Sequence, residues 1–293
     1  MNEKLESCLS DHGFYGTEDV YKATVTAIET ILTVLPDRDR WCVEFGAWDG
    51  MHGSNTRDLI VNQGFSAVLI EADEAKFHQL QRNYAGKAGV TTLRQFVGFQ
   101  SDDGLDAILN KTEIPIHFDF CCIDIDGNDY HVWKAMTQYQ PKVLCIEFNP
   151  TVPPEVNFVQ AADFEVNHGS SLAAIIQLGK LKGYELISVI GVNAFFVPSA
   201  YFPLFEIADN SILALWTKRD CVTYFFSGYD GQIFLRGCKK LPWHENLPIE
   251  ESRVQALPAA LRKYPYNRRR RIIYTCLTNP AAAIRIIWGR MTR

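Results

Sequence analysis

Between residues 36 and 200, short apolar runs alternate with amphipathic segments, and this alternation constrains the fold more than any other feature. The apolar runs are nearly continuous, which is typical of strands buried on both faces of a parallel sheet. The segments between them have the length and spacing of helices. The chain therefore predicts a doubly wound α/β fold, in which helices cover both faces of a mostly parallel sheet.

The last two apolar runs are joined by a short Gly-Val-Asn turn at 191–193. So short a connection cannot form a parallel crossover, and these two strands are expected to form an antiparallel hairpin at the end of a seven-stranded sheet. The strands are predicted at 41–45, 67–70, 90–96, 118–123, 142–148, 185–190 and 194–197, and the helices at 20–35, 54–62, 74–84, 102–109, 129–138 and 170–182.

Length and composition exclude several classes of protein. The chain has 293 residues, of which 47% are hydrophobic and 22% charged, as in an ordinary globular protein that buries a large core. Its first residues are polar and acidic, so no secretory signal is expected, and no uncharged apolar run reaches the length of about 18 residues that a spanning helix needs. Eight cysteines without a C-x-x-C pair predict buried, reduced thiols in a cytoplasmic protein.

The C-terminal residues form a separate electrostatic segment. Nine of the 29 basic residues and none of the 34 acidic residues lie from Arg262 onward, although the whole chain has a net charge of −5. Two interpretations stay open: a solvated basic end, and a helix that lies on the anionic inner face of a membrane. Nucleic acid is not expected as a partner, because the rest of the chain is acidic.

These observations divide the chain into four parts. Residues 1–35 form an N-terminal helical segment, 36–200 the main domain, 201–261 a C-terminal extension with strands, and 262–293 the basic tail. The extension is predicted to contain a β-hairpin with a turn at Asp230-Gly231. We expect it to pack on the main domain, as a lid or as the contact surface of a homo-oligomer.

The first predicted strand runs into the sequence V-E-F-G-A-W-D-G at 43–50. Its two glycines suit a sharp turn at which a ligand approaches the backbone. A phosphate-binding loop would need glycine in place of Trp48, and here a carboxylate, Glu44, precedes the loop. A carboxylate disfavours a pyrophosphate but suits a cationic ligand, and S-adenosylmethionine carries both a sulfonium and an amino group. The expected ligand-binding residues are Glu44, Gly46, Ala47, Asp49 and Gly50.

Glu71 lies at the C-terminal end of the second predicted strand, roughly 20 residues or more after the glycine loop. A carboxylate in this position accepts hydrogen bonds from both hydroxyls of a ribose. Ala72 is expected beside it in the binding site. Asp73 is expected to cap the helix that begins near Glu74.

Polar side chains follow the fourth and fifth predicted strands where those strands end. Because parallel strands end at the same edge of a sheet, Asp124, Asp126, Glu147 and Asn149 are expected to lie together. Their oxygens suit Mg²⁺ or Ca²⁺. The alternative is a metal-free acidic pocket that binds substrate hydroxyls, and Asp124 is expected to contact the ligand of the glycine loop as well.

Two residues compete for the role of general base. His168 lies in the loop before the helix at 170–182, where a histidine can reach a bound substrate. Asp126 is the other candidate. His131 lies inside a predicted helix and is expected to be structural.

The motifs at 44–50, 69–73, 123–127 and 146–149, with the segments 170–186 and 193–197, together resemble the FkbM-like class I S-adenosylmethionine-dependent methyltransferases. The resemblance implies a Rossmann-like sheet, S-adenosylmethionine as cofactor, and O-methylation of a sugar, a glycan or a glycosylated small molecule. It implies cofactor contacts for Glu44, Gly46, Gly50 and Glu71, and adenine contacts for Ser101 and Asp102. Macrocin-type sugar O-methyltransferases, which hold magnesium at the ends of the same two strands, have a paired aspartate where this chain has Glu147-Phe148-Asn149.

Two other functions stay open at this point. A nicotinamide-dependent oxidoreductase would share the acidic residue after the second strand, but Trp48 replaces a glycine that its phosphate loop needs. A non-catalytic scaffold could keep the fold without the activity, but Glu44 and Glu71 are both present.

Overall fold

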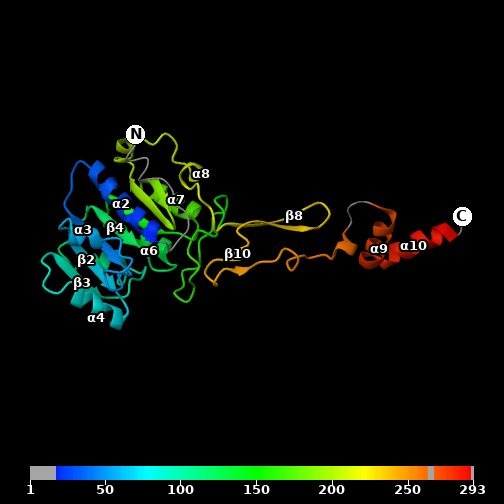
Figure 1. Ribbon diagram of the computed structural model, residues 1–293, viewed down its shortest axis with the longest axis horizontal. Coiled ribbons are helices and arrows are strands. Elements are labelled where there is room, and N and C mark those ends of the chain that lie inside the picture. The colour runs from blue at the N-terminus through cyan, green and yellow to red at the C-terminus, as the bar shows by residue number, and fades with distance from the viewer. Residues whose placement is uncertain (1–17, 263–266, 292–293) are drawn as a thin grey trace. The chain divides into compact units, whose positions relative to one another are not determined.

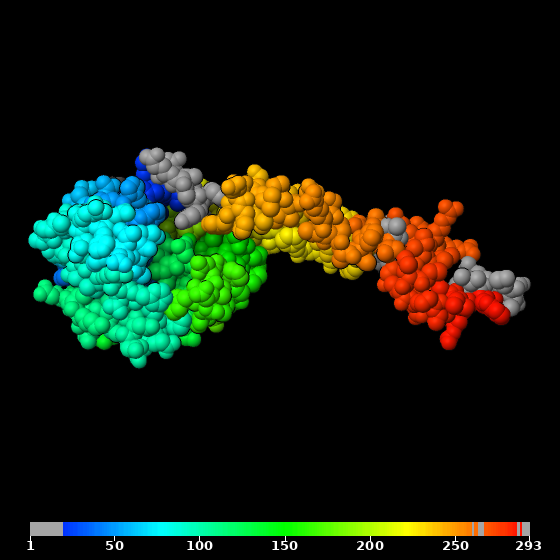
Figure 2. Space-filling view, turned by 90° about the horizontal axis from the view of Figure 1, so that it is seen from below, coloured from blue at the N-terminus to red at the C-terminus, as the bar shows by residue number. Residues whose placement is uncertain are grey.

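The computed structural model describes residues 18–262 and 267–291, which form two compact units (Figure 1). The first unit extends to Arg219 and the second begins at Asp220. Figure 2 shows the surface of the same chain, with the first unit in blue, cyan and green. Expectations for residues 1–17, among them Cys8, lie outside the described residues.

A seven-stranded sheet in the order β3-β2-β1-β4-β5-β7-β6 forms the centre of the first unit. Strand β7 pairs antiparallel with β5 and with β6, and the other pairs are parallel. This order is that of the class I methyltransferase fold, so the predicted fold class and the closing hairpin are confirmed. The strands are β1 (Trp41–Phe45), β2 (Ser66–Glu71), β3 (Val90–Arg94), β4 (Phe120–Ile123), β5 (Val143–Glu147), β6 (Tyr184–Ile190) and β7 (Asn193–Pro198).

Helices cover both faces of the sheet. On one face, Ile28 and Leu32 of α2 are packed in a buried cluster with Cys122 and Cys145, and full burial of such a side chain stabilises the fold by about 1.5–3 kcal/mol. On the other face, Trp133 of α6 packs edge-on against Tyr184 of β6 and at a tilt against Phe196 of β7. The helices are α2 (Glu18–Val34), α3 (Arg57–Val61), α4 (Glu74–Asn83), α5 (Leu105–Leu109), α6 (Asp129–Ala135) and α7 (Leu172–Leu181).

Helix α3 is shorter than the sequence predicts. Instead of 54–62 it spans Arg57–Val61, because the residues before it bind the carboxylate of Glu44 rather than continuing the helix. Helix α4 begins after Asp73, whose side chain accepts a hydrogen bond from the backbone N–H of Lys76 at 2.9 Å, as expected of a cap.

The second unit begins with the predicted β-hairpin, formed by β8 (Thr223–Ser227) and β9 (Ile233–Gly237). Its remaining elements are β10 (Lys240–Leu241), β11 (Leu247–Pro248), η2 (Ala259–Leu261), α9 (Arg268–Thr278) and α10 (Pro280–Met291). The short elements η1 (Phe202–Phe205) and α8 (Ile212–Leu215) belong to the first unit. Within the described ranges, no helix has both the length and the apolar character needed to cross a membrane.

The cysteines agree with the expectation of reduced, buried thiols. Every described cysteine is free, and five of them are buried. Burial raises the pKa of Cys121, and a hydrogen bond with Cys145 together with burial raises the pKa of Cys122, which keeps these thiols protonated and unreactive.

At the edge of the sheet where the strands begin, a buried ion-pair network joins three segments. Asp119, which is fully buried, accepts hydrogen bonds from Lys142 Nζ at 2.8 Å and from the backbone N–H groups of Asp39 and Arg40 at 3.1 and 3.0 Å. Lys142 Nζ also binds a carboxylate oxygen of Asp39 at 3.1 Å. The negative charge buried at this edge is therefore paired and fully hydrogen-bonded.

Candidate functional site

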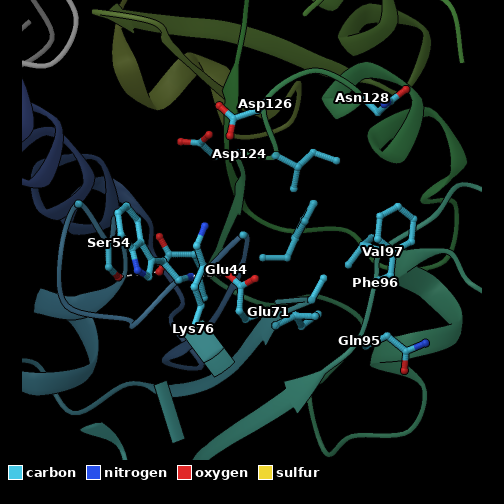
Figure 3. A pocket seen from close by; sticks show the side chains of 18 of the residues that line it. Glu44, Ser54, Glu71, Lys76, Gln95, Phe96, Val97, Asp124, Asp126 and Asn128 are labelled. Carbon is cyan, nitrogen blue, oxygen red and sulfur yellow. Dashed lines mark hydrogen bonds between the residues drawn. The ribbon is translucent and has the colours of Figure 1, made fainter. Parts of the chain in front are cut away.

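A pocket with a volume of about 620 Å³ opens at the carboxyl ends of β1, β2 and β4 (Figure 3). The chain runs from β1 outward to β3 and then returns to place β4 on the other side of β1. Ligands of open α/β sheets bind at this kind of switch point. The lining includes six of the residues expected to bind a cofactor, Glu44, Gly46, Ala47, Glu71, Ala72 and Asp124, together with Asp126.

The two glycines of the loop after β1 are required by packing within the protein. Gly46 and Gly50 have φ values of 72° and 69°, where a side chain is disfavoured. A Cβ at Gly46 would lie 2.3 Å from the carbonyl oxygen of Asp124, and a Cβ at Gly50 would lie 2.5 Å from the ring of Tyr84. Glycine at these positions therefore lets the loop contact β4 and α4 closely.

Within this loop, the backbone N–H groups of Ala47, Trp48 and Gly50 already have acceptors in the protein. The N–H of Ala47 donates to the carbonyl of Ile70, and that of Gly50 to the carbonyl of Ala47. Asp49 accepts the N–H groups of the two residues after Gly50 at 2.9 and 2.8 Å. A pyrophosphate needs free N–H donors in such a loop, and the bonds of Ala47, Trp48 and Gly50 leave this loop with fewer of them.

Trp48 takes the place where a phosphate loop has glycine. It adopts a left-handed conformation with φ of 50°, and its ring is half exposed beneath the Lys76 ammonium, 4.8 Å from the ring centroid. The bulky ring at this point of the pocket wall fits the expectation that the ligand is not a dinucleotide.

Glu44 is buried and anchors the segment before α3. Its carboxylate accepts hydrogen bonds from Ser54 Oγ and Thr56 Oγ1, both at 2.6 Å, and from the backbone N–H of Asn55 at 2.8 Å. Burial raises its pKa, although these three bonds oppose the shift. The side chain therefore shapes the pocket wall as well as lining it.

Glu71 ends β2 and faces the pocket with a carboxylate that is held by the backbone. One oxygen accepts the N–H of Trp48 and the other the N–H of Asp73, both at 2.8 Å. Each carboxylate oxygen accepts two hydrogen bonds, so Glu71 retains one acceptor position on each oxygen. This fixed, two-pronged acceptor has the geometry that a pair of ribose hydroxyls requires.

The part of the pocket wall expected to contact adenine is formed by a different segment from the one predicted. Ser101 and Asp102 are exposed and do not line the pocket. Instead the lining contains Gln95, Phe96 and Val97, which directly follow β3.

Aromatic rings lie at the part of the pocket wall that follows β3. Phe164, from the loop after β5, packs edge-on against Phe96 with centroids 4.5 Å apart and stacks on Phe99 at 4.8 Å. Phe96 and Phe164 are both exposed, and both line the pocket. Such a wall offers an apolar surface to a flat ring.

The expected acidic cluster forms from three of its four predicted members. Ligand oxygens of Asp124, Asp126 and Glu147 lie within 4.8 Å of one another. Burial and the nearby charge of Asp126 raise the pKa of Asp124 to about 6, and burial and the charge of Asp124 raise the pKa of Glu147 strongly. Within the described part of the chain, no Lys, Arg or His forms an ion pair with these three carboxylates.

Asn149, the fourth predicted member, has a different environment. Its amide oxygen accepts hydrogen bonds from the N–H and the hydroxyl of Thr151 at 2.8 and 2.6 Å, and its amide nitrogen donates to the carbonyl of His168 at 2.6 Å. The side chain thus closes a turn after β5. The His168 side chain is exposed and does not line the pocket, whereas Asp126 does.

Two further residues position the site, and neither is among the predicted site residues. Asp129 is buried and accepts the N–H groups of Ile125 and Gly127, both at 3.0 Å, which fixes the loop that carries Asp126 in a left-handed conformation. Burial and the charge of Asp124 raise its pKa to about 7. An acid one helical turn after a strand-end acid was the available signal.

Gln160 is the second of these residues, and it fastens the loop between β5 and α7. Its side-chain oxygen accepts the N–H groups of His168 and Gly169 at 3.0 and 2.8 Å, and its side-chain nitrogen donates to the carbonyl of Val166 at 2.9 Å. Its own carbonyl is bonded to the ring of His131 at 2.8 Å, so His131 is structural, as expected. The loop segment that carries Phe164 is held in place through this residue.

Comparison with known proteins adds the following. No known protein-family profile and no curated protein matches the sequence. Among solved structures, the chain is similar to the CurJ carbon methyltransferase (10% identity, TM-score 0.41, covering 62% of this chain and 55% of that one). It is also similar to an S-adenosylmethionine-dependent methyltransferase from Aquifex aeolicus (11% identity, TM-score 0.37, covering 67% and 95%).

A third similar structure is a putative sarcosine dimethylglycine methyltransferase from Galdieria sulphuraria (15% identity, TM-score 0.38, covering 64% and 76%). The chain spans about half the length of the CurJ domain and of the citrinin polyketide synthase methyltransferase domain, 55% and 52%. The fold assignment itself rests on the strand order described above.

Proposed function

We propose that the chain is an S-adenosylmethionine-dependent methyltransferase that binds its cofactor in the pocket at the ends of β1, β2 and β4. The observation that carries the proposal is an acidic pocket at the switch point, in whose glycine loop the N–H groups of Ala47, Trp48 and Gly50 are already bonded within the protein. Glu71 offers two fixed acceptors to the ribose hydroxyls. The acidic lining favours the positive charge of the sulfonium and amino groups, and it disfavours a pyrophosphate.

The cofactor's adenine is proposed to lie against the wall formed by Phe96 and Phe164, in place of the segment at Ser101 and Asp102. Aromatic faces stack on flat rings with a gain of about 0.5–1.5 kcal/mol beyond area burial. This position lies at the end of β3, next to β2 in the sheet, so it extends the ribose site in the direction away from β4.

The reaction we propose is methyl transfer to the oxygen of a sugar or glycan hydroxyl, as in the FkbM-like enzymes. The hydroxyl oxygen forms a bond to the methyl carbon while the carbon–sulfur bond breaks, and the sulfonium becomes a neutral thioether. The hydroxyl proton is transferred to a carboxylate. Asp126 is the proposed base, because it lines the pocket and His168 does not.

A binding experiment tests the cofactor assignment directly. Isothermal titration of the purified protein with S-adenosylhomocysteine should show one site per chain, and titration with NADH should show none. Binding of NADH alone would establish an oxidoreductase instead, and binding of neither would support a non-catalytic scaffold. With radiolabelled S-adenosylmethionine, a panel of glycosides should identify the acceptor by transfer of label.

We further propose that the basic end of the chain contacts an anionic membrane surface, which would bring the enzyme to a membrane-linked acceptor. Helix α9 begins with Arg268-Arg269-Arg270-Arg271, and the exposed side chains Ile273 and Leu277 follow one helical turn apart. Trp288 of α10 is also exposed. Basic and apolar side chains on short helices bind anionic interfaces, at about 1 kcal/mol per basic residue. Homo-oligomerisation stays a prediction.

Vesicle sedimentation tests the membrane proposal. The double variant Arg268→Gln/Arg269→Gln should bind vesicles containing phosphatidylserine at least about tenfold more weakly than the unmodified chain, since two basic residues are removed. The matched control, Lys239→Gln/Lys240→Gln, removes two exposed charges from the same unit and should bind as before. Equal binding by both variants would refute the proposal, and cofactor affinity should change in neither.

A further inference from the structure

A row of four residues crosses the sheet at the edge where the parallel strands end. Phe45 of β1 pairs with Ile123 of β4, and Ile123 pairs with Ile146 of β5, so the next position along each strand brings Gly46, Asp124 and Glu147 side by side. In the antiparallel pair of β5 and β7, Glu147 lies directly opposite Asn193. Residues in register point to the same face of a sheet, so Asp124, Glu147 and Asn193 share one face.

The amide oxygen of Asn193 has no hydrogen-bond partner, although the residue is only 9% exposed. A buried carbonyl oxygen without a partner costs about 1–3 kcal/mol, so such atoms are rare unless a ligand satisfies them. Asn193 lies opposite Glu147, one of the three clustered carboxylates. Among the described residues, no Lys, Arg or His forms an ion pair with that cluster. The amide oxygen of Asn193 is a neutral acceptor, whereas the three carboxylates carry negative charge. A bound cation would accept ligand oxygens of both kinds.

We propose that Asp124, Asp126, Glu147 and Asn193 form a binding site for a divalent cation that prefers oxygen ligands, Mg²⁺ or Ca²⁺. The donor set consists of three carboxylates and one amide oxygen, which is the chemistry that these ions select. Cation–oxygen distances of about 2.1–2.4 Å place ligand oxygens up to about 4.2–4.8 Å apart. The three carboxylates already meet that limit, since their oxygens lie within 4.8 Å of one another.

Asn193 replaces Asn149 as the amide ligand in this site. The oxygen of Asn149 already accepts two hydrogen bonds from Thr151, which use both of its lone pairs. The oxygen of Asn193 accepts none. The site therefore draws on three strands, β4, β5 and β7, rather than on two.

The role of the cation rests on the proposed function. When bound beside the cofactor pocket, a divalent cation would lower the pKa of an acceptor hydroxyl. One carboxylate oxygen of Asp126 can then serve as ligand while the other takes the hydroxyl proton, because a carboxylate has two oxygens. An acceptor with adjacent hydroxyls, as sugars have, would suit such a site.

The test uses the full chain, freed of metal with EDTA and then dialysed. Titration calorimetry with MgCl₂, CaCl₂ and MnCl₂ should show one site per chain, and the electron spin resonance signal of free Mn²⁺ should fall with the same stoichiometry. No binding of any of the three ions up to millimolar concentration would overturn the proposal, and it would leave the three carboxylates as a proton-sharing acidic pocket.

Variants locate the ligands. Asn193→Ala should weaken Mn²⁺ binding at least about tenfold, as loss of a metal-site partner typically does, whereas Asn149→Ala should change it less than about twofold. Asn193→Asp, which keeps an oxygen at the same place, should bind Mn²⁺ at least as well as the unmodified chain. If Asn193→Ala fails to fold, the Asp variant and Glu147→Gln, which should abolish binding, still decide the question.

The metal and cofactor assignments can fail separately. Unchanged Mn²⁺ affinity in Asn193→Ala, or a tenfold loss in Asn149→Ala, would refute the ligand set. Binding of S-adenosylhomocysteine without any metal binding would refute the cation site and leave the methyltransferase proposal standing. Metal binding without binding of S-adenosylhomocysteine would support the site and refute the function assigned to it.

Discussion

The central sheet has buried carboxylates at both of its edges, and the two edges differ in how the charge is balanced. Where the strands begin, Asp119 is paired with Lys142 and bound by two backbone N–H groups. Where they end, Asp124, Asp126 and Glu147 lie close together, and no Lys, Arg or His among the described residues forms an ion pair with them. A buried charge is costly unless it is paired. The paired network at the first edge therefore has a structural role, whereas the unpaired carboxylates at the second edge form a candidate ligand site.

The pKa values follow this difference. Burial alone would lower the pKa of Lys142, but its bonds to Asp119 and Asp39 outweigh that cost and the pKa is raised. At the other edge, burial and mutual repulsion raise the pKa values of Asp124 and Glu147, so each carboxylate keeps its proton to a higher pH than an exposed carboxylate does. Opposite charges stabilise one edge, whereas protons or a bound cation are needed at the other.

The largest expected effect lies at the balanced edge. Lys142→Met leaves the fully buried Asp119 without its cation and should lower the free energy of unfolding by about 3–5 kcal/mol, measured by urea denaturation. The control is Lys76→Met, which removes an exposed lysine that contacts Trp48 and should cost about 1 kcal/mol or less. Similar losses in the two variants would mean that the network at Asp119 has no special weight.

The next effect lies at the open edge and concerns binding. Glu71→Gln removes the charged acceptor for the ribose hydroxyls and should weaken S-adenosylhomocysteine binding about 10- to 100-fold, since a hydrogen bond to a charged group contributes about 1.5–3 kcal/mol. Titration calorimetry measures it. Glu74→Gln removes an exposed carboxylate three residues later and should leave the affinity as it is. Loss of affinity in both would point to general electrostatics rather than to a ribose contact.

A smaller effect appears in the pH dependence of stability without added metal. The folded-state pKa values of Asp124 and Asp129, about 6 and about 7, lie above their ordinary values, so the folded state binds more protons than the unfolded state. Their contribution is present below about pH 4 and is lost as the pH rises towards 7, by about 1–3 kcal/mol. The melting temperature should therefore fall between these pH values.

Asp124→Asn separates this effect from the titration of other groups. The variant should show a flatter dependence of melting temperature on pH, while Asp102→Asn, an exposed carboxyl outside the pocket, should follow the unmodified chain. A melting temperature that rises with pH in the unmodified chain, or an equal slope in Asp124→Asn, would contradict the account of the open edge.

The smallest expected effect concerns the aromatic wall. Phe164→Leu should weaken S-adenosylhomocysteine binding about three- to tenfold, because it removes a ring contact that contributes about 0.5–1.5 kcal/mol. Phe158→Leu changes a half-buried ring in the same loop that does not line the pocket, and it should bind the ligand normally. Equal affinities in the two variants would place the adenine elsewhere.

The open edge was largely predictable where it depends on parallel strands. Asp124 and Glu147 each follow an apolar run, and parallel strands end at one edge, so the sequence alone brings them together. Asn193 escaped this argument because β7 is antiparallel and presents its first residue, rather than its last, at that edge. A rule that considers only strand ends misses the residue that begins the antiparallel strand.

Other differences arise from contacts between distant segments. Ser54 and Thr56 look like the first turn of a helix, but the carboxylate of Glu44 binds them and delays the helix to Arg57. Gln160 bonds to five other residues of its own loop and of α6, yet a single glutamine in an irregular segment carries no periodic signal. Local pattern predicts the strands and helices well, and long-range hydrogen bonds decide where they stop.

The close approach of Gly46 to Asp124 has a consequence for how two ligands bind at the pocket. Because the backbone of the first loop abuts the carbonyl of Asp124 with no room for a methyl group, a ligand that displaces one loop displaces the other. Thermodynamic reciprocity then requires that a ligand at the glycine loop and a ligand at the acidic cluster alter each other's affinity by the same factor. Each ligand would accordingly change the affinity of the other, whichever of the two binds first.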